Sequence, residues 1–347
     1  MNGKSLKLLI VSLLISLMII ALLTSCKKND LNTSISDSKF LLGTIITMQL
    51  FGTEDEKLLE ESFKIIESID NQMSLNVVDS ELSKLNESAG KGPYPLSDEM
   101  FYVLKKSIEY GELSAGRLDV TLEPVIRLWG IGTEEAAVPE DNELEKALEN
   151  VDYTKVVLNS EDKTAELPSG MSVDLGSIGK GYAADQVADY LKEQGVQKAI
   201  LNLGGNILII GEKDAGTPFR VGLQNPFDSR NEYFGVVEVM DKTVVTSGIY
   251  ERNFEQDGIL YHHILDTETG YPVNNSVTSV SIIADSSIDA DAMSTVLFVL
   301  GVEEGLELCE SIANIECVYV TNDYQVYMSS GAKNAVTITN DKFKVAN

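Results

Sequence analysis

An acidic pair opens an otherwise apolar stretch near the C-terminal end of the chain. The stretch runs Ile288-Asp-Ala-Asp-Ala-Met-Ser-Thr-Val-Leu-Phe298, with a threonine four residues after the second aspartate. On a helix, residues i and i+4 share a face, so Asp291 and Thr295 can present two oxygens to one ion. Hard cations such as Mg²⁺ prefer oxygen ligands. The alternative is that Asp289 caps the helix and Asp291 favours its dipole. This segment alone leaves both open.

A glycine-rich turn is the second candidate site. The segment from Met171 to Asp185 predicts a strand, a turn at Gly176-Ser-Ile-Gly-Lys-Gly181 and a helix that ends at Gly195. Glycines let main-chain N–H groups approach phosphate oxygens, and Lys180 would add a mobile cation. The spacing matches neither a Walker A loop nor the dinucleotide fingerprint. A tight strand-to-helix turn without a ligand is the alternative.

Two adjacent histidines and one aspartate are further candidates. Neighbouring strand residues point to opposite faces, so only one of His262 and His263 can enter a given pocket. A histidine with a purely structural role is the ordinary alternative. Asp119 is flanked by apolar residues, in a segment that leads to the only tryptophan, Trp129. Such an aspartate can serve a site or can be satisfied by the main chain.

The charge of the chain limits its partners. The formal net charge is −27, from 27 Lys and Arg against 54 Asp and Glu. This argues against nucleic acid and against adhesion of the protein surface to anionic lipid. An acidic protein can still bind a phosphate compound through a local device: a metal, main-chain N–H groups or a single lysine. Two histidines are too few for a His-rich zinc site. Cys309 and Cys317 can pair or remain buried thiols.

The first 25 residues predict an export signal. Lys4 and Lys7 precede an apolar run from Leu8 to Leu23, and a short segment of small residues ends at Cys26. A cysteine at this position is typical of a bacterial lipoprotein, in which the thiol is acylated. An uncleaved transmembrane anchor is the alternative. Both place the protein at the bacterial cell membrane, on the extracytoplasmic side.

The rest of the chain predicts an α+β protein. Residues 26–38 are expected to form a polar, lipid-anchored tether, and residues 39–347 one large domain of two intermixed lobes, with mostly antiparallel sheets and flanking helices. No proline-rich linker divides the chain. The elements expected include a strand over 39–51, a helix opened by a capping box at 53–56, a helix capped by Ser97, a β-meander over 219–284 and helices over 291–300 and 303–313.

Taken together, these segments resemble the ApbE family of bacterial flavin transferases, the FAD:protein FMN transferases. The resemblance runs from about Leu41 to Gly301. The motifs, in chain order, are Leu42-Gly-Thr44, Met73-Ser-Leu-Asn76, Asp79-Ser-Glu-Leu82, Asp119-Val-Thr121, Leu128-Trp-Gly130, Val173-Asp-Leu-Gly-Ser-Ile-Gly-Lys-Gly-Tyr-Ala-Ala-Asp185, Leu203-Gly-Gly-Asn206, Thr246-Ser-Gly-Ile-Tyr-Glu-Arg252, His263-Ile-Leu-Asp266, Thr269-Gly-Tyr-Pro272 and Asp289-Ala-Asp-Ala-Met-Ser-Thr295. Each is weak alone; the ordered set is specific.

The resemblance implies a T-fold-like architecture and the transfer of FMN from FAD, the substrate, onto a threonine hydroxyl of an exported or membrane-bound redox protein, with release of AMP. It implies Mg²⁺ as cofactor, held by the main-chain carbonyl of Ser177 and the side chains of Asp291 and Thr295. The residues implied to line the FAD site are Leu42, Leu75, Asn76, Arg117, Leu118, Asp119, Lys180 and His263. Leu42 stands where the family usually has methionine, and Asn76 where the family varies.

This chemistry suits the residues. Attack at the FMN-side phosphorus of FAD is phosphoryl transfer, which depends on positioning and charge stabilisation. A base must accept the threonine proton, and His263 is the natural candidate for that catalytic role. Two alternatives remain at this point. One is a Mg²⁺-dependent FAD pyrophosphatase that uses water and gives FMN and AMP. The other is a flavin-binding lipoprotein without catalysis.

Overall fold

The computed structural model describes residues 33–228 and 232–347. The predicted signal peptide and the lipidation site at Cys26 lie outside these ranges. The first strand, β1, covers Ser34–Leu41 and therefore begins within the predicted tether. The folded domain thus starts before residue 39, where the sequence placed its beginning, because this strand pairs along its whole length with the next one.

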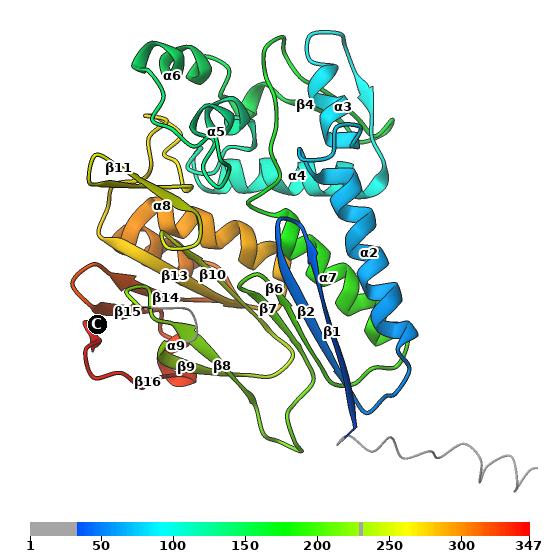
Figure 1. Cartoon of the computed structure of the whole chain (residues 1–347), viewed down its shortest axis with the longest axis vertical. Coiled ribbons are helices and arrows are strands. Elements are labelled where there is room, and N and C mark those ends of the chain that lie inside the picture. Colours follow the sequence, from blue (N-terminus) through cyan, green and yellow to red (C-terminus); the bar gives the residue numbers. More distant parts are fainter. Residues whose placement is uncertain (1–32, 229–231) are drawn as a thin grey trace, which may run out of the picture.

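A nine-stranded sheet forms the centre of the molecule (Figure 1). Neighbouring strands run antiparallel except the last pair, which is parallel. Their order is β1, β2 (Thr44–Phe51), β6 (Ala199–Leu203), β7 (Asn206–Ile210), β10 (Thr243–Gly248), β13 (Val277–Ala284), β14 (Ile315–Thr321), β15 (Gln325–Met328) and β17 (Lys344–Val345). Every residue of the central strand β13 is buried, because both faces of the sheet are covered.

Helices cover one face of this sheet and build the second lobe (Figure 1). Helix α8 packs on β10 and β13, α7 packs on α8, and α2 packs on α7. The helices are α2 (Lys57–Met73), α3 (Glu81–Glu87), α4 (Asp98–Leu113), α5 (Glu123–Trp129), α6 (Asp141–Leu148), α7 (Gly179–Glu193), α8 (Ser287–Ser311) and α9 (Ala332–Ala335), with 3₁₀ turns η1 (Val120–Leu122) and η2 (Tyr153–Lys155). The large apolar core lies between the sheet and helices α2, α3, α4, α7 and α8.

Smaller sheets complete the fold. Strands β16 (Val336–Ile338), β9 (Tyr233–Val239) and β8 (Phe219–Gln224) enclose a second apolar core with other residues of the large sheet. A three-stranded sheet in the helical lobe contains β3 (Tyr94–Pro95), β5 (Thr164–Glu166) and β4 (Val157–Asn159). The hairpin of β11 (Asn253–Gln256) and β12 (Ile259–His262) stands apart from these sheets. The α+β class with antiparallel sheets, predicted from the sequence, is confirmed.

Several local predictions were wrong. The segment 39–51 is not one strand but the end of β1, a two-residue turn at Leu42 and Gly43, and β2. Both turn residues have positive φ, 51° and 67°, as a tight hairpin requires. The strand expected from Met171 is absent within the described ranges, and the segment is an irregular approach to α7. By contrast, the two helices expected over 291–300 and 303–313 are confirmed as two helical segments of α8, separated by the non-helical Gly301 with φ 78° and ψ −173°. Only the start of the first segment lies earlier, at Ser287.

The caps of two early helices had different outcomes. Ser97 caps α4 as predicted, because its hydroxyl accepts from the N–H of Met100 at 3.2 Å. The capping box at the start of α2 is wrong. The Thr53 hydroxyl accepts from the N–H of Asp55, within the turn before the helix, and the residue at the cap position makes no side-chain cap. Where main-chain N–H groups can be satisfied within a turn, a capping pattern in the sequence does not determine where the helix begins.

A third apolar cluster joins the helical lobe to the β11–β12 hairpin. Trp129 is fully buried at its centre, and its Nε1 donates to the Gly270 carbonyl at 2.7 Å. The rings of Phe254, Tyr261 and Tyr271 surround it. Since Gly270 lies a few residues after the two histidines, this cluster ties that part of the chain to α5.

The described residues include no helix long and apolar enough to cross a membrane. The two cysteines that the sequence left open, Cys309 and Cys317, are both buried and free. A hydrogen bond with Cys309 and burial raise the pKa of the Cys317 thiol, so this thiol is protonated and unreactive at neutral pH.

Replacing the central tryptophan tests the importance of this third cluster. We expect Trp129→Phe to lower the free energy of unfolding by about 1–3 kcal/mol, because the buried carbonyl of Gly270 loses its donor. Urea denaturation followed by circular dichroism measures the change. The control is Tyr271→Phe, which removes an exposed hydrogen bond to Asp141 and should cost less than about 0.5 kcal/mol. Equal effects of the two variants would contradict the prediction.

Candidate active site

The start of α8 is capped from another helix. Asp185 of α7 accepts from the N–H groups of Ser287 and Ile288 at 2.8 and 2.9 Å. The hydroxyl of Ser286 accepts from the N–H of Asp289. The prediction that Asp289 is the cap is therefore wrong, because other groups already satisfy the first N–H groups of the helix.

The Asp289 carboxylate has a different role. It accepts from the Lys106 ammonium at 3.0 Å and from the Tyr110 hydroxyl at 2.8 Å, both on α4. This contact ties α4 to the start of α8. Helix capping and the α4 contact account for Ser286, Asp185 and Asp289, but not for Asp291.

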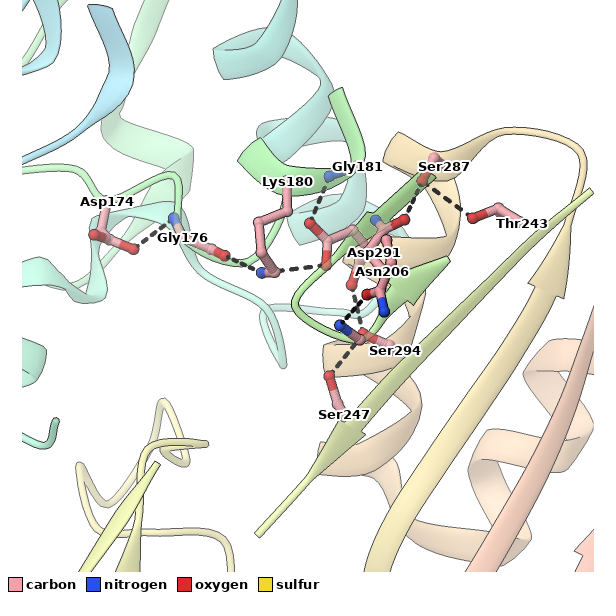
Figure 2. Close-up of polar contacts among 12 residues, drawn as sticks. Asp174, Gly176, Lys180, Gly181, Asn206, Thr243, Ser247, Ser287, Asp291 and Ser294 are labelled. Atoms are coloured by element: carbon pink, nitrogen blue, oxygen red, sulfur yellow. Dashed lines mark hydrogen bonds and ion pairs between the residues drawn. The ribbon is translucent and has the colours of Figure 1, made fainter. Parts of the chain in front are cut away.

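Asp291 faces the glycine-rich turn instead. Its side chain is 4% exposed, and one carboxylate oxygen accepts from the N–H of Gly181 at 2.8 Å. The other oxygen lies 3.6 Å from the ammonium of Lys180 (Figure 2). Burial raises the pKa of this carboxyl, and the charge of Lys180 opposes the shift. The acidic residue singled out in the sequence thus meets the positive N-terminal end of α7.

Lys180 bridges the turn and the carboxylate. Its ammonium donates to the Gly176 carbonyl at 3.4 Å while it approaches Asp291 (Figure 2). Ser177 follows in the turn, and Thr295 lies one helical turn after Asp291; both are half-buried. A cation already lies between a main-chain carbonyl and a buried carboxylate. The donors are oxygens alone, which is the set that Mg²⁺ prefers, so these residues fit that ion.

The close approach of turn and helix depends on Gly181. A Cβ atom at this position would lie 2.3 Å from the carbonyl oxygen of Ser287 and 2.6 Å from the Cα of Ile288. Any side chain would therefore push α7 away from α8 and lengthen the bond to Asp291. Gly179, two residues earlier, has nothing within 4 Å of its corresponding position.

A polar seam beneath α8, formed by Asn206, Thr243, Ser247, Ser287 and Ser294, holds this helix on the sheet (Figure 2). Ser294 donates to the main-chain carbonyl of residue 291 and shares a hydrogen bond with Ser247, both at 2.7 Å. Ser287 donates to the Asn206 side chain at 2.8 Å and lies 3.1 Å from the Thr243 hydroxyl. The seam sets the depth and rotation of α8, and so the direction of Asp291.

Asp119 is held by the main chain. One oxygen accepts from the N–H and the hydroxyl of Thr121 at 2.8 and 2.6 Å, and the other accepts from the N–H of Tyr153 at 3.0 Å. Burial raises its pKa, and these hydrogen bonds oppose the shift. Of the two roles left open by the sequence, satisfaction by the main chain is the one seen here. The N–H of Asp174 donates to Val120, which places this segment beside the glycine-rich turn.

The residues before Asp119 adjoin the segment that follows the histidines. Arg117 forms an ion pair with Glu268 at 3.1 Å, and Thr267 donates to the Gly116 carbonyl at 2.8 Å. Leu118 is buried, 4% exposed. The structure therefore brings this segment, the histidine segment and the glycine-rich turn together.

His263 is fixed in one tautomer. Its N–H and its ring Nδ1 each lie 3.1 Å from the Arg252 carbonyl oxygen, which can only accept. Nδ1 therefore carries the proton, and Nε2 has a free lone pair. Burial lowers the pKa of the ring to about 4, and the charges of Arg252 and Lys180 add to the shift. His262 is buried, with its Nε2 on the Val273 carbonyl, so a structural role suits it.

The predicted flavin contacts lie at the hairpin turn and the end of α2. The N–H of Leu42 donates to Asp70 of α2 at 3.0 Å. Leu75 is partly buried against the large core, whereas Asn76 is exposed and its N–H donates to the nearby Ser74 hydroxyl. The hairpin turn reaches Arg252, whereas the hydrogen bond of Asn76 stays within its own turn.

Sequence reasoning missed three residues that organise this site. Asp174 accepts from the N–H of Gly176 at 2.8 Å and shapes the turn; Asp185 caps α8; Arg252 holds His263. Asp174 and Asp185 flank the glycine-rich turn in the sequence, and this position was the available signal. Arg252 ends the motif that begins at Thr246, but its neighbours in the chain do not indicate its role, because its partner His263 follows the β11–β12 hairpin.

A cavity of about 520 Å³ is lined by Asp185 but by neither Asp174 nor Arg252. It contains none of the predicted site residues, and carboxylates dominate its polar lining. These are Asp98, Glu99, Asp185, Asp189, Asp241 and Asp285, against Lys192 and Lys242. Such a lining repels a diphosphate. Within the described ranges no group of three His, Cys, Asp or Glu side chains could hold a metal, so an ion at Asp291 needs hydroxyl, main-chain or phosphate oxygens.

The chain matches the model of the ApbE family over residues 42–319, and it belongs to that family. A curated FAD:protein FMN transferase of Klebsiella pneumoniae is 34% identical over 300 residues, covering 86% of this chain and 93% of the relative. The ApbE protein of Thermotoga maritima superposes with a TM-score of 0.81 at 28% identity, covering 87% of this chain and 99% of that one. The flavin transferase ApbE of Vibrio cholerae gives 0.79 at 31%, with the same coverage.

Two glycine substitutions in one helix test the close approach of α7 and α8. We expect Gly181→Ala to lower the free energy of unfolding by about 1–3 kcal/mol, because its methyl group meets main-chain atoms of α8. Gly179→Ala, with open space around it, should be neutral or stabilise by up to about 1 kcal/mol. Thermal denaturation of both variants measures the two changes in stability. A neutral Gly181→Ala would show that the two helices can separate freely.

Proposed function

We propose that this protein transfers FMN from FAD to a threonine hydroxyl of an exported or membrane-bound redox protein, with Mg²⁺, and releases AMP. The observation that carries the proposal is the buried Asp291 carboxylate, which faces Lys180 and the N-terminus of α7. The names of the relatives, FAD:protein FMN transferase, support the flavin substrate and the protein acceptor. The Mg²⁺ and the threonine are the finer parts of the proposal.

The glycine-rich turn is suited to the diphosphate of FAD. It leads into α7, whose first N–H groups and dipole favour an anion, and Lys180 adds a positive charge. The rest of the chain is strongly acidic, with a net charge of −27. The attraction of an anion therefore has to come from such a local arrangement.

The residues that would hold Mg²⁺ are Asp291, Thr295 and the main-chain carbonyl of Ser177. When bound, the ion would neutralise charge on the diphosphate. Asp291 keeps its direction through the polar seam and through the N–H of Gly181. Lys180 can move from the carboxylate to a phosphate oxygen, since it lies 3.6 Å from Asp291 and 27% of its side chain is exposed.

His263 is the proposed general base. Its Nε2 is unprotonated at neutral pH, because burial disfavours the charged ring and Nδ1 donates to the Arg252 carbonyl. This nitrogen can accept the proton of the threonine hydroxyl as the oxygen attacks phosphorus. The main-chain bond at Nδ1 keeps the ring in place during the transfer.

We also propose that the mature chain is anchored by a lipid on Cys26, at the extracytoplasmic side of a bacterial membrane. The support is the basic, apolar and small-residue order of the first 26 residues. Such an anchor would keep the enzyme at the surface where membrane-bound acceptors lie.

Incubation with FAD, Mg²⁺ and a candidate acceptor tests the reaction. The proposal expects AMP in solution and flavin fluorescence on the acceptor in a denaturing gel. AMP with an unlabelled acceptor would favour the hydrolase, in which water replaces the threonine. Intact bound FAD without AMP would favour the binding protein and overturn the proposal.

Two aspartates on one helix separate the metal role from a structural role. We expect Asp291→Ala to abolish Mg²⁺-dependent release of AMP, because the only carboxylate among the proposed ligands is lost. Asp289→Asn, the control, changes the contact with Lys106 and Tyr110 and should leave the Mg²⁺ dependence of the rate unchanged. Titration with Mg²⁺ while AMP is measured gives the comparison. Full activity of Asp291→Ala would remove the metal assignment.

The depressed pKa of His263 predicts an unusual pH profile. The ring stays neutral down to about pH 4. We therefore expect kcat/KM for AMP release to fall only as the pH approaches that value, because a protonated ring cannot accept the threonine proton. A free imidazole would lose it near 6.5. Initial rates across this range, with circular dichroism to verify folding, test the profile. An acid limb centred near 6.5 would contradict it.

A further inference from the structure

Arg252 lies where three segments of the site meet. Its carbonyl oxygen holds both the N–H and the Nδ1 of His263, each at 3.1 Å. Its side chain extends to the turn of the β1–β2 hairpin, where a Cβ on Gly43 would lie 3.2 Å from Nη2. It also passes the loop after α5, where a Cβ on Gly132 would lie 3.4 Å from its Cδ.

These two glycines form a slot for the arginine. Both have positive φ, 67° at Gly43 and 95° at Gly132, so the main chain turns there in a way that suits glycine. A side chain on either residue would contact the arginine. The hairpin turn is itself held by the bond from the Leu42 N–H to Asp70. The path of Arg252 across the site is thus set by main-chain atoms.

No carboxylate among the described residues neutralises the guanidinium of Arg252. Arg117, Arg127 and Arg220 each form an ion pair with a glutamate. Arg252, by contrast, is exposed and has no carboxylate within 4 Å in residues 33–228 and 232–347. In a chain with 54 acidic residues, a cation in such a slot is available for an anionic ligand.

The charge of Arg252 acts inside the site. Burial raises the pKa of Asp174, and the charges of Arg252 and Lys180 oppose that shift. The same two cations lower the pKa of His263, after burial. Arg252 and Lys180 therefore both act electrostatically on Asp174 and His263. Lys180 lies on the Asp291 side, and Arg252 lies on the side of the hairpin turn.

We propose that Arg252 binds the phosphate of the FMN half of FAD, the group that is transferred. The inference rests on the proposed function and names a second anion-binding residue at the same site. Guanidinium presents paired N–H donors that match phosphate oxygens. Because its own carbonyl orients His263, the arginine lies beside the base and hence beside the phosphorus that is attacked.

Atoms and charge balance in the transfer of FMN to the acceptor hydroxyl. The acceptor oxygen forms a bond to the FMN phosphorus, the bond from that phosphorus to the bridging oxygen breaks, and AMP leaves with the bridging oxygen. The hydroxyl proton passes to Nε2 of His263. Arg252 holds the non-bridging oxygens of the transferred group, where negative charge must be stabilised throughout the step.

The side chain of Arg252 can be changed without removing the anchor of His263, because that anchor is main-chain. The variants are Arg252→Gln and Arg252→Lys, with Arg220→Gln as the control, an exposed arginine of β8 that pairs with Glu238. Isothermal titration with FMN and with AMP, each in the presence of Mg²⁺, measures binding. Release of AMP from FAD measures turnover.

We expect Arg252→Gln to weaken FMN binding roughly 10- to 100-fold and to leave AMP binding unchanged. Its kcat/KM should fall by about 10²-fold. Arg252→Lys should recover part of the FMN affinity, and Arg220→Gln should match the unmodified protein. In a third variant, Arg252→Ala, added guanidinium ion should restore part of the rate.

Two results would overturn the inference: unchanged FMN affinity in Arg252→Gln with a normal melting temperature, or equal losses for FMN and AMP. The FMN titration does not depend on turnover. If the unmodified protein binds FMN through Arg252 but releases no AMP, the proposed function fails and this inference stands.

Discussion

The contact between Gly181 and Asp291 is the constraint on which the rest of the site depends. A buried carboxylate is unfavourable unless it is hydrogen-bonded or paired, and here the N-terminus of α7 supplies the N–H and the nearby cation. The bond forms only because residue 181 has no side chain, so that α7 can touch main-chain atoms of α8. One contact thus joins the turn suited to phosphate to the helix suited to a metal.

Each of the two central helices, α7 and α8, supplies a carboxylate to the N-terminal end of the other. Asp185 of α7 accepts the first N–H groups of α8, and Asp291 of α8 accepts an N–H in the first turn of α7. Each positive helix end is therefore stabilised by a negative charge on the other helix. The two ends serve different purposes. At the start of α8, both carboxylate oxygens of Asp185 accept main-chain N–H groups. At the start of α7, one carboxylate oxygen of Asp291 faces the ammonium of Lys180.

The site has local positive charge, although the chain as a whole is strongly acidic. A net charge of −27 opposes the approach of a dinucleotide, so the attraction is local: a helix N-terminus, Lys180 and Arg252, which pairs with no carboxylate of the described residues. The same arginine fixes the tautomer of His263 through its carbonyl. Burial then keeps the ring neutral, so the proposed base stays uncharged, and the charges of Arg252 and Lys180 act in the same direction. Membership of the ApbE family agrees with this arrangement.

The sequence by itself determined the α+β class, the Ser97 cap, the pairing of Asp291 with Thr295 on one helical face and the glycine-rich turn, because these depend on residues close in the chain. The ordered motifs also indicated the family. The structure shows that Asp289 is not a cap, since the nearby Ser286 hydroxyl and Asp185, about a hundred positions away, accept the first N–H groups of α8. It decided that main-chain groups hold Asp119 and that Arg252 holds His263. A local sequence pattern allows several hydrogen-bond partners for one side chain, and long-range contacts determine which of them it has in the folded protein.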